Sequence, residues 1–296
     1  MLKQYIKLHT IVFLWGFTSI LGVLITLSSI EIVFYRTLIS AAILGVILAF
    51  NKNRSKINWR KVLPLVLTGF VVALHWILFF ASAKVSKVSI CLAGMATASL
   101  FTSVLEPLIN RSQFKYYEVF LGVLVMAGLY AIFHFEYDHV LGLSLALASA
   151  FLSALFTVFN SSFSKKYDPV SVSFYEMLGA FICCVICLPL YQIFLSTGQS
   201  INLVPTSIDW LWIMILALVC TVYAFYACMQ VLKHLSAFSM NLIVNMEPVY
   251  GIILAFILFG ESEQMTNGFY LGTCVILISV LAHPLLDRWF KPKALA

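Results

Sequence analysis

Long apolar segments alternate with short polar connections along almost the whole chain. Ten such segments occur, each close to the roughly 20 helical residues that cross a bilayer core of about 30 Å. In order they are His9–Leu27, Ile32–Phe50, Leu63–Ala83, Ser89–Ile109, Glu118–Phe135, Leu141–Phe159, Val170–Phe194, Trp210–Val231, Ala237–Phe259 and Asn267–His283. This pattern predicts an all-α integral membrane protein with ten transmembrane helices.

The composition agrees with this class and excludes a water-soluble domain. Of the 296 residues, 62% are hydrophobic and only 10% are charged, whereas a soluble domain carries about 25% charged residues. Lys3 and Lys7 precede the first apolar segment, as in a signal peptide. That segment is long, no small-x-small cleavage site follows it, and nine more segments come after. We therefore expect it to remain as the first helix.

The basic residues predict the orientation in the membrane. With the N-terminus in the cytoplasm, 15 of the 18 lysines and arginines lie in cytoplasmic segments, and only Lys84 and Lys87 lie outside. Cytoplasmic loops are generally enriched in Lys and Arg. Both termini are therefore predicted in the cytoplasm, in the inner (plasma) membrane of a cell. The net charge of +6 is spread over separate loops, so it does not form the basic face of a nucleic-acid-binding protein.

Short matches between the two halves of the chain predict an internal repeat. Phe34-Tyr35-Arg36 matches Phe174-Tyr175-Glu176, and Leu121-Gly122 matches Leu271-Gly272 in the same order. The repeats would comprise residues 1–137 and 138–296, with five helices each. Because five is odd, the second half enters the membrane with the opposite orientation. Inverted repeats of this kind are the architecture of many secondary transporters.

The segment LKHLSAFSMNLIVNMEPVYGIILAFILFGE, residues 232–261, resembles the EamA-like branch of the drug/metabolite transporter superfamily. The ten segments in two halves fit the same family. In the first half, Thr97-Ala98 stands where the repeat places Glu247-Pro248, which departs from the usual pattern. The resemblance implies a permease for small metabolites, often an exporter, with a central cavity between the halves.

Three charged residues fall deep inside apolar segments: Arg36, Glu176 and Glu247. A charge near the bilayer centre costs at least about 2.5–3.5 kcal/mol on insertion scales, so each needs a partner or a wet cavity. At 1.5 Å per helical residue, Arg36 and Glu176 differ in height by about 12 Å across the core, which is too far for a salt bridge. Glu247 lies between them. Each of the three either binds a solute or locks neighbouring helices together.

Further polar and aromatic side chains are expected to line the path. The candidates are Trp15, His75, Trp76, Asn160, Tyr223, Tyr226 and Asn245. Asn241 and Asn245 form an i, i+4 pair about 200° from Glu247 around an ideal helix. The pair and Glu247 therefore face one cavity only if the helix distorts near Pro248; otherwise the asparagines bond to a neighbouring helix.

Two other sets of residues have a structural interpretation. Glu106 lies near a cytoplasmic helix end close to Arg111 and Lys115, so we expect a solvated pairing there. Cys183, Cys184 and Cys187 share a helix face and would permit a thiolate metal site. No His or acidic residue lies nearby in sequence, so small buried hydrophobes are the favoured interpretation. We expect no metal, no cofactor and no disulfide framework.

The pattern as a whole favours a secondary transporter that moves a small organic solute, such as an amino acid or a drug-like molecule, by alternating access. A channel-like facilitator is the alternative. A membrane-embedded enzyme is less favoured, because no His-Glu-x-x-His motif occurs, and the absence of a Walker A sequence argues against ATP-driven pumping. The expected partners are the solute, the lipid bilayer and a second copy of the chain in a homodimer.

Overall fold

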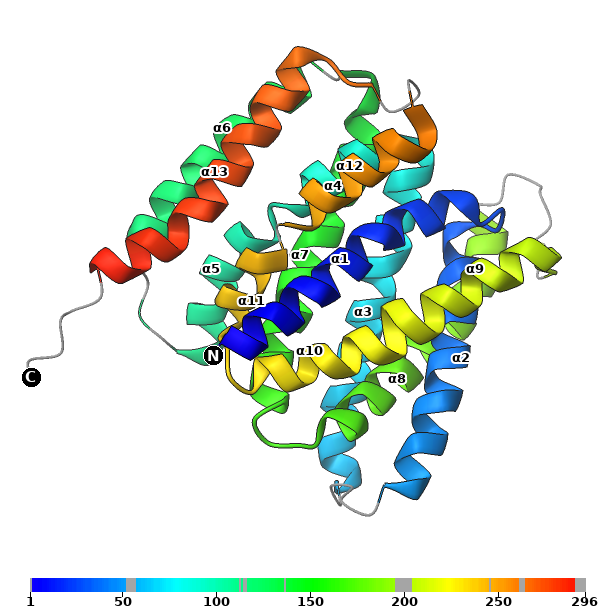
Figure 1. Cartoon of the computed structure of the whole chain (residues 1–296). Helices are drawn as coiled ribbons and strands as arrows, with labels where there is room; N and C mark the ends of the chain where they lie inside the picture. Colours follow the sequence, from blue (N-terminus) through cyan, green and yellow to red (C-terminus); the bar gives the residue numbers. More distant parts are fainter. Residues whose placement is uncertain are drawn as a thin grey trace, which may run out of the picture.

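The computed structural model describes residues 2–51, 57–111, 113, 116–135, 137–194, 204–244, 246–260 and 264–290, and it is all helical over these ranges. The elements, drawn in Figure 1, are α1 (Leu2–Leu24), α2 (Ser29–Phe50), α3 (Trp59–Val85), α4 (Val88–Met95), α5 (Ala98–Asn110), α6 (Tyr116–Phe135), the 3-10 turn η1 (Tyr137–His139), α7 (Val140–Phe163), α8 (Pro169–Phe194), α9 (Ser207–Ala217), the π-helix η2 (Leu218–Tyr223), α10 (Ala224–Leu232), α11 (Ala237–Val244), α12 (Glu247–Phe259) and α13 (Asn267–Phe290).

Seven helices in the described ranges are long and apolar enough to cross a membrane: α1, α2, α3, α7, α8, the α4–α5 pair and the continuous run from α9 to α10. Shorter apolar helices occur at Phe120–Ile132, Glu247–Phe259 and Asn267–Ser279. The prediction of an all-α, multi-pass membrane protein is confirmed. Helix α1 begins at Leu2 instead of His9, and α13 continues to Phe290, because polar flanking residues continue the helix beyond the apolar part.

Two predicted segments are not continuous helices. Within Ser89–Ile109, α4 ends at Met95 and α5 begins at Ala98. The Thr97 hydroxyl turns back to donate to the Gly94 carbonyl at 2.7 Å. Within Ala237–Phe259, α11 ends at Val244 and α12 begins at Glu247, with Pro248 in its first turn. Proline suits that position because the first N–H groups of a helix have no partner within the helix.

Small residues allow helices from different parts of the chain to cross closely. Figure 1 shows α6 and α13 lying along each other at one edge of the bundle. A Cβ added to Gly128 would come within 2.7 Å of the Gly272 carbonyl oxygen, and one added to Gly272 within 2.6 Å of the Gly128 oxygen. In membranes, close backbone approach at small residues is a main source of helix association. The two glycines therefore fix the α6–α13 pair.

A second crossing joins α3 to α8 next to Glu176. A Cβ at Gly69 would overlap the Glu176 carbonyl oxygen, and a Cβ at Gly179 would overlap the carbonyl of Val66. Both obstacles are backbone atoms, which cannot move aside as a side chain can. Helix α3 also packs along α7. This crossing therefore sets the distance between the elements that carry His75 and Glu176.

We predict that Gly69→Val destabilises the protein. The expected loss is at least about 1–3 kcal/mol, which is typical of an overpacked core. The measurement is the melting temperature in detergent, together with the monodispersity of the sample. Leu67→Val is the matched control, since Leu67 lies on the same helix but is 53% exposed. Equal melting temperatures for the two variants would contradict the close crossing.

Candidate functional site

A single cavity collects most of the predicted site residues in the described part of the chain. It encloses about 670 Å³ of space not occupied by atoms, counted to its open mouth, between α1, α2, α3, α4, α7, α10, α11 and α12. Its lining residues are Trp15, Thr18, Arg36, His75, Trp76, Phe79, Met95, Ser153, Phe156, Thr157, Asn160, Phe225, Cys228, Met229, Leu232, Met240, Asn241, Val244 and Glu247. The wall is thus mainly aromatic and aliphatic, with a few polar groups and two charges.

Arg36 is only 1% exposed and is held by groups on neighbouring elements of the bundle. Its Nε donates to the Thr221 hydroxyl at 2.6 Å, and Nη2 donates to the Cys220 carbonyl at 3.4 Å. The guanidinium lies 3.7 Å above the ring centre of Trp76, which is a cation–π distance. The third nitrogen, Nη1, is buried and has no hydrogen-bond partner among the described residues. One donor group of a fixed cation is therefore available to a ligand.

The acceptors for Arg36 exist because the helix is irregular there. Residues Leu218–Tyr223 form the π-helix η2 between α9 and α10. The Cys220 carbonyl accepts from Arg36 and from Trp15 Nε1, the latter at 3.2 Å. The Thr221 hydroxyl donates to the Leu216 carbonyl five residues earlier, at 2.8 Å. Short π-helical segments are frequent at functional sites, and this one provides a carbonyl and a hydroxyl for the buried cation.

Glu247 is the first residue of α12 and lines the same cavity, with 7% of its surface exposed. It attracts Arg36 electrostatically, yet within the described residues its carboxylate makes no hydrogen bond and no ion pair within 4.0 Å. The two opposite charges thus face one space without neutralising each other by contact. A small molecule bound between Arg36 and Glu247 would give each charge the polar partner that it lacks.

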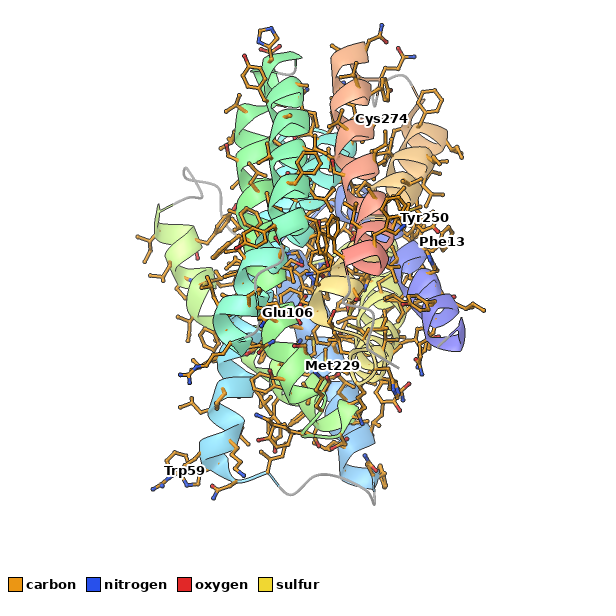
Figure 2. All side chains as sticks on the ribbon, turned by 90° about the vertical axis from the view of Figure 1, so that its left-hand side faces the viewer. Phe13, Trp59, Glu106, Met229, Tyr250 and Cys274 are labelled. Carbon is orange, nitrogen blue, oxygen red and sulfur yellow. The ribbon has the colours of Figure 1, made fainter. Side chains whose placement is uncertain are left out.

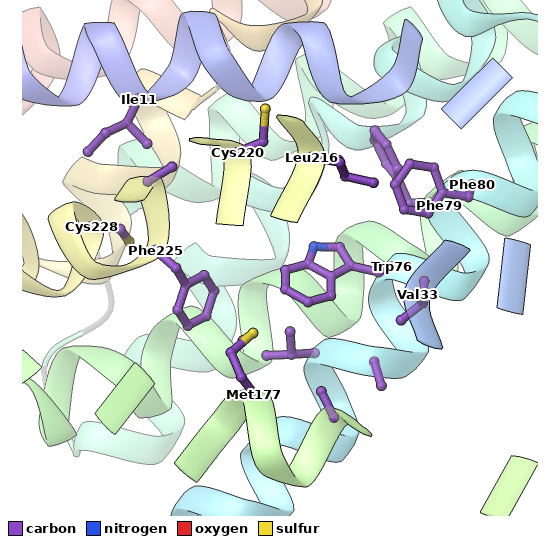
Figure 3. Close-up of a cluster of buried hydrophobic side chains, with 14 of the residues drawn as sticks. Ile11, Val33, Trp76, Phe79, Phe80, Met177, Leu216, Cys220, Phe225 and Cys228 are labelled. Atoms are coloured by element: carbon purple, nitrogen blue, oxygen red, sulfur yellow. The ribbon is translucent and has the colours of Figure 1, made fainter. Parts of the chain in front are cut away.

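The aromatic side chains approach the cavity from several helices. Trp76 and Phe225 face each other in Figure 3, with ring centres 6.1 Å apart. His75 is fixed by Ser149 of α7, whose carbonyl and hydroxyl lie 2.9 and 2.8 Å from Nδ1. His75, Trp76 and Trp15 all line the cavity, so these three lie where they were expected.

Glu176 lies behind the cavity wall and not in it. It is 0% exposed, and its Oε2 accepts from Asn160 Nδ2 at 3.2 Å. Asn160 itself lines the cavity. Arg36 and Glu176 form no ion pair, in agreement with the difference in depth derived from the sequence. Glu176 therefore does not touch the cavity directly, because Asn160 stands in front of it.

Two other predicted residues, Tyr223 and Tyr226, do not contribute to the cavity wall. Tyr223 is 49% exposed, and the Tyr226 hydroxyl accepts from Gln230 at 2.6 Å. The inward face of α10 carries its residues at positions 225, 228, 229 and 232, which follow the helical period. At ideal helical spacing, Tyr226 lies about 100° from Phe225 around the helix and Tyr223 about 160°, so both lie away from that face. Asn245 lies outside the described residues.

The charged and aromatic residues were the candidates taken from the sequence, and several polar residues of the cavity wall were not among them. Asn241 donates to Thr102 of α5 at 2.7 Å, which confirms the expected bond to a neighbouring helix. Asn241 also lines the cavity together with Glu247, because the helix is interrupted between α11 and α12. On α7, Ser153, Thr157 and Asn160 follow each other at helical spacing. That polar stripe is a signal in the sequence that could have been used.

Polar contacts join the two halves of the chain at both ends of the cavity. Glu106 on α5 accepts from the backbone N–H groups of Ala237 and Phe238 at 3.2 and 2.8 Å, at the start of α11. At the other end, the buried Asp209 on α9 accepts from the Thr26 N–H and hydroxyl at 2.8 and 2.7 Å. Figure 2 shows Glu106 near the height of Met229, a cavity residue.

Glu106 binds the start of α11, and the described residues show no pairing of Glu106 with Arg111; Lys115, the other expected partner, lies outside the described residues. The first N–H groups of a helix have no partner within the helix and carry partial positive charge, so a carboxylate is stabilised there. Ala237, the first residue of α11, is buried, so its N–H group needs a partner from another helix. Glu106 supplies it.

The chain is similar to known proteins along almost its whole length. The model of the EamA-like transporter family matches twice, at residues 3–134 and 140–282. A protein of Archaeoglobus fulgidus described as an uncharacterized transporter is 25% identical over 290 residues, covering 94% of this chain and 98% of that protein. A chain in a solved crystal structure has a TM-score of 0.68 at 14% identity, covering 98% of this chain and 99% of the other. That last likeness concerns the fold alone.

We predict that Glu106→Ala lowers stability by about 1–3 kcal/mol, because two N–H groups at the start of α11 lose their acceptors. The measurement is the midpoint of thermal unfolding in detergent. Arg111→Asn is the control: it removes the charge once expected to pair with Glu106, and Asn tolerates the left-handed backbone at this position, where φ is 55°. A larger loss of thermal stability in Arg111→Asn than in Glu106→Ala would support the pairing of Glu106 with Arg111 instead.

Proposed function

Because the chain belongs to the EamA-like transporter family, we propose that it is a secondary transporter that exports a small organic solute across the inner membrane by alternating access. The solute binds in the central cavity. Its chemical class is an amino acid or a drug-like molecule of similar charge and size. The chain acts as a carrier and not as an enzyme.

One observation carries this proposal: two incompletely satisfied charges of opposite sign face one mainly aromatic cavity. Arg36 offers Nη1, and Glu247 offers a carboxylate without a hydrogen bond in the described part of the chain. Hydrogen bonds to charged groups are stronger than neutral ones, and a guanidinium is well suited to a carboxylate. A solute with a carboxylate, an ammonium group and an apolar body fits all three elements of the wall. Ligand sites commonly combine an apolar wall with a few placed polar groups.

The arrangement of the chain supports alternating access. The family model matches residues 3–134 and 140–282 separately, which supports two five-helix repeats within residues 1–137 and 138–296. We propose that these repeats are inverted and supply ten transmembrane helices, with both termini in the cytoplasm. The breaks before Ala98 and before Glu247 place one broken helix in each half, as in other transporters whose sites lie at the repeat interface.

The contacts at the two ends of the cavity are the proposed closures. Glu106 links α5 of the first half to α11 of the second. Asp209 links α9 of the second half to Thr26 of the first. Rocking of the halves would break one link while the other persists. By the distribution of Lys and Arg, the Asp209 link lies toward the outside and the Glu106 link toward the cytoplasm.

The function is tested with purified protein in liposomes preloaded with a mixture of unlabelled amino acids. We predict saturable uptake of at least one labelled amino acid, by exchange for the unlabelled amino acids inside. Liposomes without internal amino acids should take up no more label than passive equilibration allows. An untargeted metabolite comparison of cells with and without the protein extends the same test to other solutes. Single-channel currents in place of saturable exchange would establish the channel alternative.

We further predict that Arg36→Gln and Glu247→Gln each reduce exchange at least tenfold, because each removes a charge that pairs with the solute, and tenfold corresponds to about 1.4 kcal/mol. Asp138→Asn is the matched control, since this carboxylate is exposed in η1 away from the cavity, and it should exchange at the wild-type rate. Wild-type exchange in both cavity variants would contradict the assigned site even if transport itself is found.

A further inference from the structure

Three buried oxygen atoms on α7 and α8 have no hydrogen-bond partner among the residues that the structure describes. They are Glu176 Oε1, Asn160 Oδ1 and the hydroxyl of Ser173. Ser173 precedes Glu176 by three residues, so the two share a face of α8. Glu176 and Asn160 are bonded to each other through their remaining polar atoms at 3.2 Å. Unsatisfied buried polar groups are rare in proteins, and each requires an explanation.

The surroundings of Glu176 hold no compensating cation among the described residues. Helix α8 packs against α2, α3 and α10. Arg36, the one cation on α2, is turned toward Cys220, Thr221 and Trp76. The ionisable side chains that remain on these elements near mid-span are Tyr35, Tyr175, His75 and Tyr226, with the thiols of Cys183, Cys184, Cys187 and Cys228. Glu176 interacts electrostatically with Cys228, and a thiol supplies no positive charge.

The packing leaves little room for another ion. Gly69 of α3 lies against the Glu176 backbone so closely that an added Cβ would overlap its carbonyl oxygen. The described residues contain no group of three or more His, Cys, Asp or Glu side chains placed to hold a metal. A bare carboxylate with one neutral donor is costly in such an environment. A proton is the smallest cation that removes this cost.

We propose that Glu176 is a reversible proton-binding site, distinct from the Arg36–Glu247 solute site and connected to it through Asn160. On loading, an O–H bond of a hydronium ion breaks, Glu176 Oε1 forms an O–H bond with that proton and loses its negative charge, and a water molecule is left. On unloading, the Glu176 O–H bond breaks and the proton passes to a water molecule, which becomes hydronium. The protonated carboxyl gains a donor that the acceptor-only carboxylate lacks.

Asn160 connects this site to the cavity. Its side chain lines the cavity and at the same time donates to Glu176. When a solute draws the amide of Asn160 toward the cavity, Glu176 loses the one hydrogen bond that stabilises its charged form. Solute occupancy and proton occupancy would thus influence each other. This coupling rests on the proposed transport function, whereas the proton site itself does not.

The proton site is tested with protons alone, by infrared difference spectroscopy of the reconstituted wild-type protein on stepping the pH. We predict a carbonyl stretch of a protonated carboxylic acid in a dry environment. The band should disappear in Glu176→Gln and persist in Glu247→Gln. The glutamine keeps an acceptor for Asn160, so the fold has no cause to change. In Asn160→Leu the band should persist at a higher frequency, because the carbonyl has lost its hydrogen bond.

Several outcomes would overturn the proposal. A band that survives in Glu176→Gln and vanishes in Glu247→Gln would place the proton in the solute site. A band whose pH dependence moves with sodium concentration would identify a sodium site in its place. No band in the folded wild-type protein at any pH step would show that Glu176 does not exchange a proton over that pH range. None of these outcomes requires a transported solute, so failure of the proton site and failure of the transport proposal are distinguishable.

Discussion

The structure depends on how it accommodates the buried charge of Arg36. A charge at this depth costs at least about 2.5–3.5 kcal/mol on insertion scales, and the bundle meets that cost with a carbonyl, a hydroxyl and an indole ring from other helices. The compensation is incomplete, because Nη1 has no hydrogen-bond partner in the part of the chain that the structure describes. An interior that only needed stability would not retain such an atom. Because Nη1 lies beside the cavity, a bound solute that accepts from it would offset part of the free energy lost by burying Arg36.

The local irregularities of the helices serve the same purpose. The π-helix Leu218–Tyr223 provides the Cys220 carbonyl, and the break before α12 brings Glu247 and Asn241 to one surface. Such backbone is tolerated in a membrane only where it is enclosed by protein or lines a cavity. The start of α11 illustrates the rule, since Glu106 on another helix accepts from its first two N–H groups. The π-helix and the interruption before α12 therefore provide several of the polar groups of the site.

Hydrophobicity and charge were predictable from the sequence, whereas backbone irregularity was not. Apolar runs identified the helical membrane class, and the depth of Arg36 and Glu176 correctly excluded an ion pair between them. Tyr223 and Tyr226 were expected in the cavity wall, but the inward face of α10 is the one that carries Phe225. The rotation of a helix cannot be derived from composition when all its faces are apolar. Likewise, no sequence pattern showed that Asn160 separates Glu176 from the cavity.

The central claim, that the cavity is a solute site open to one side of the membrane at a time, is tested most directly at Cys228. This thiol lines the cavity, and replacing the other six cysteines leaves it as the reporter for a small membrane-impermeant thiol reagent. The account predicts modification from one side of oriented vesicles and slower modification when an exchangeable amino acid is present. Equal modification from both sides at once, at a rate that no tested solute changes, would contradict it.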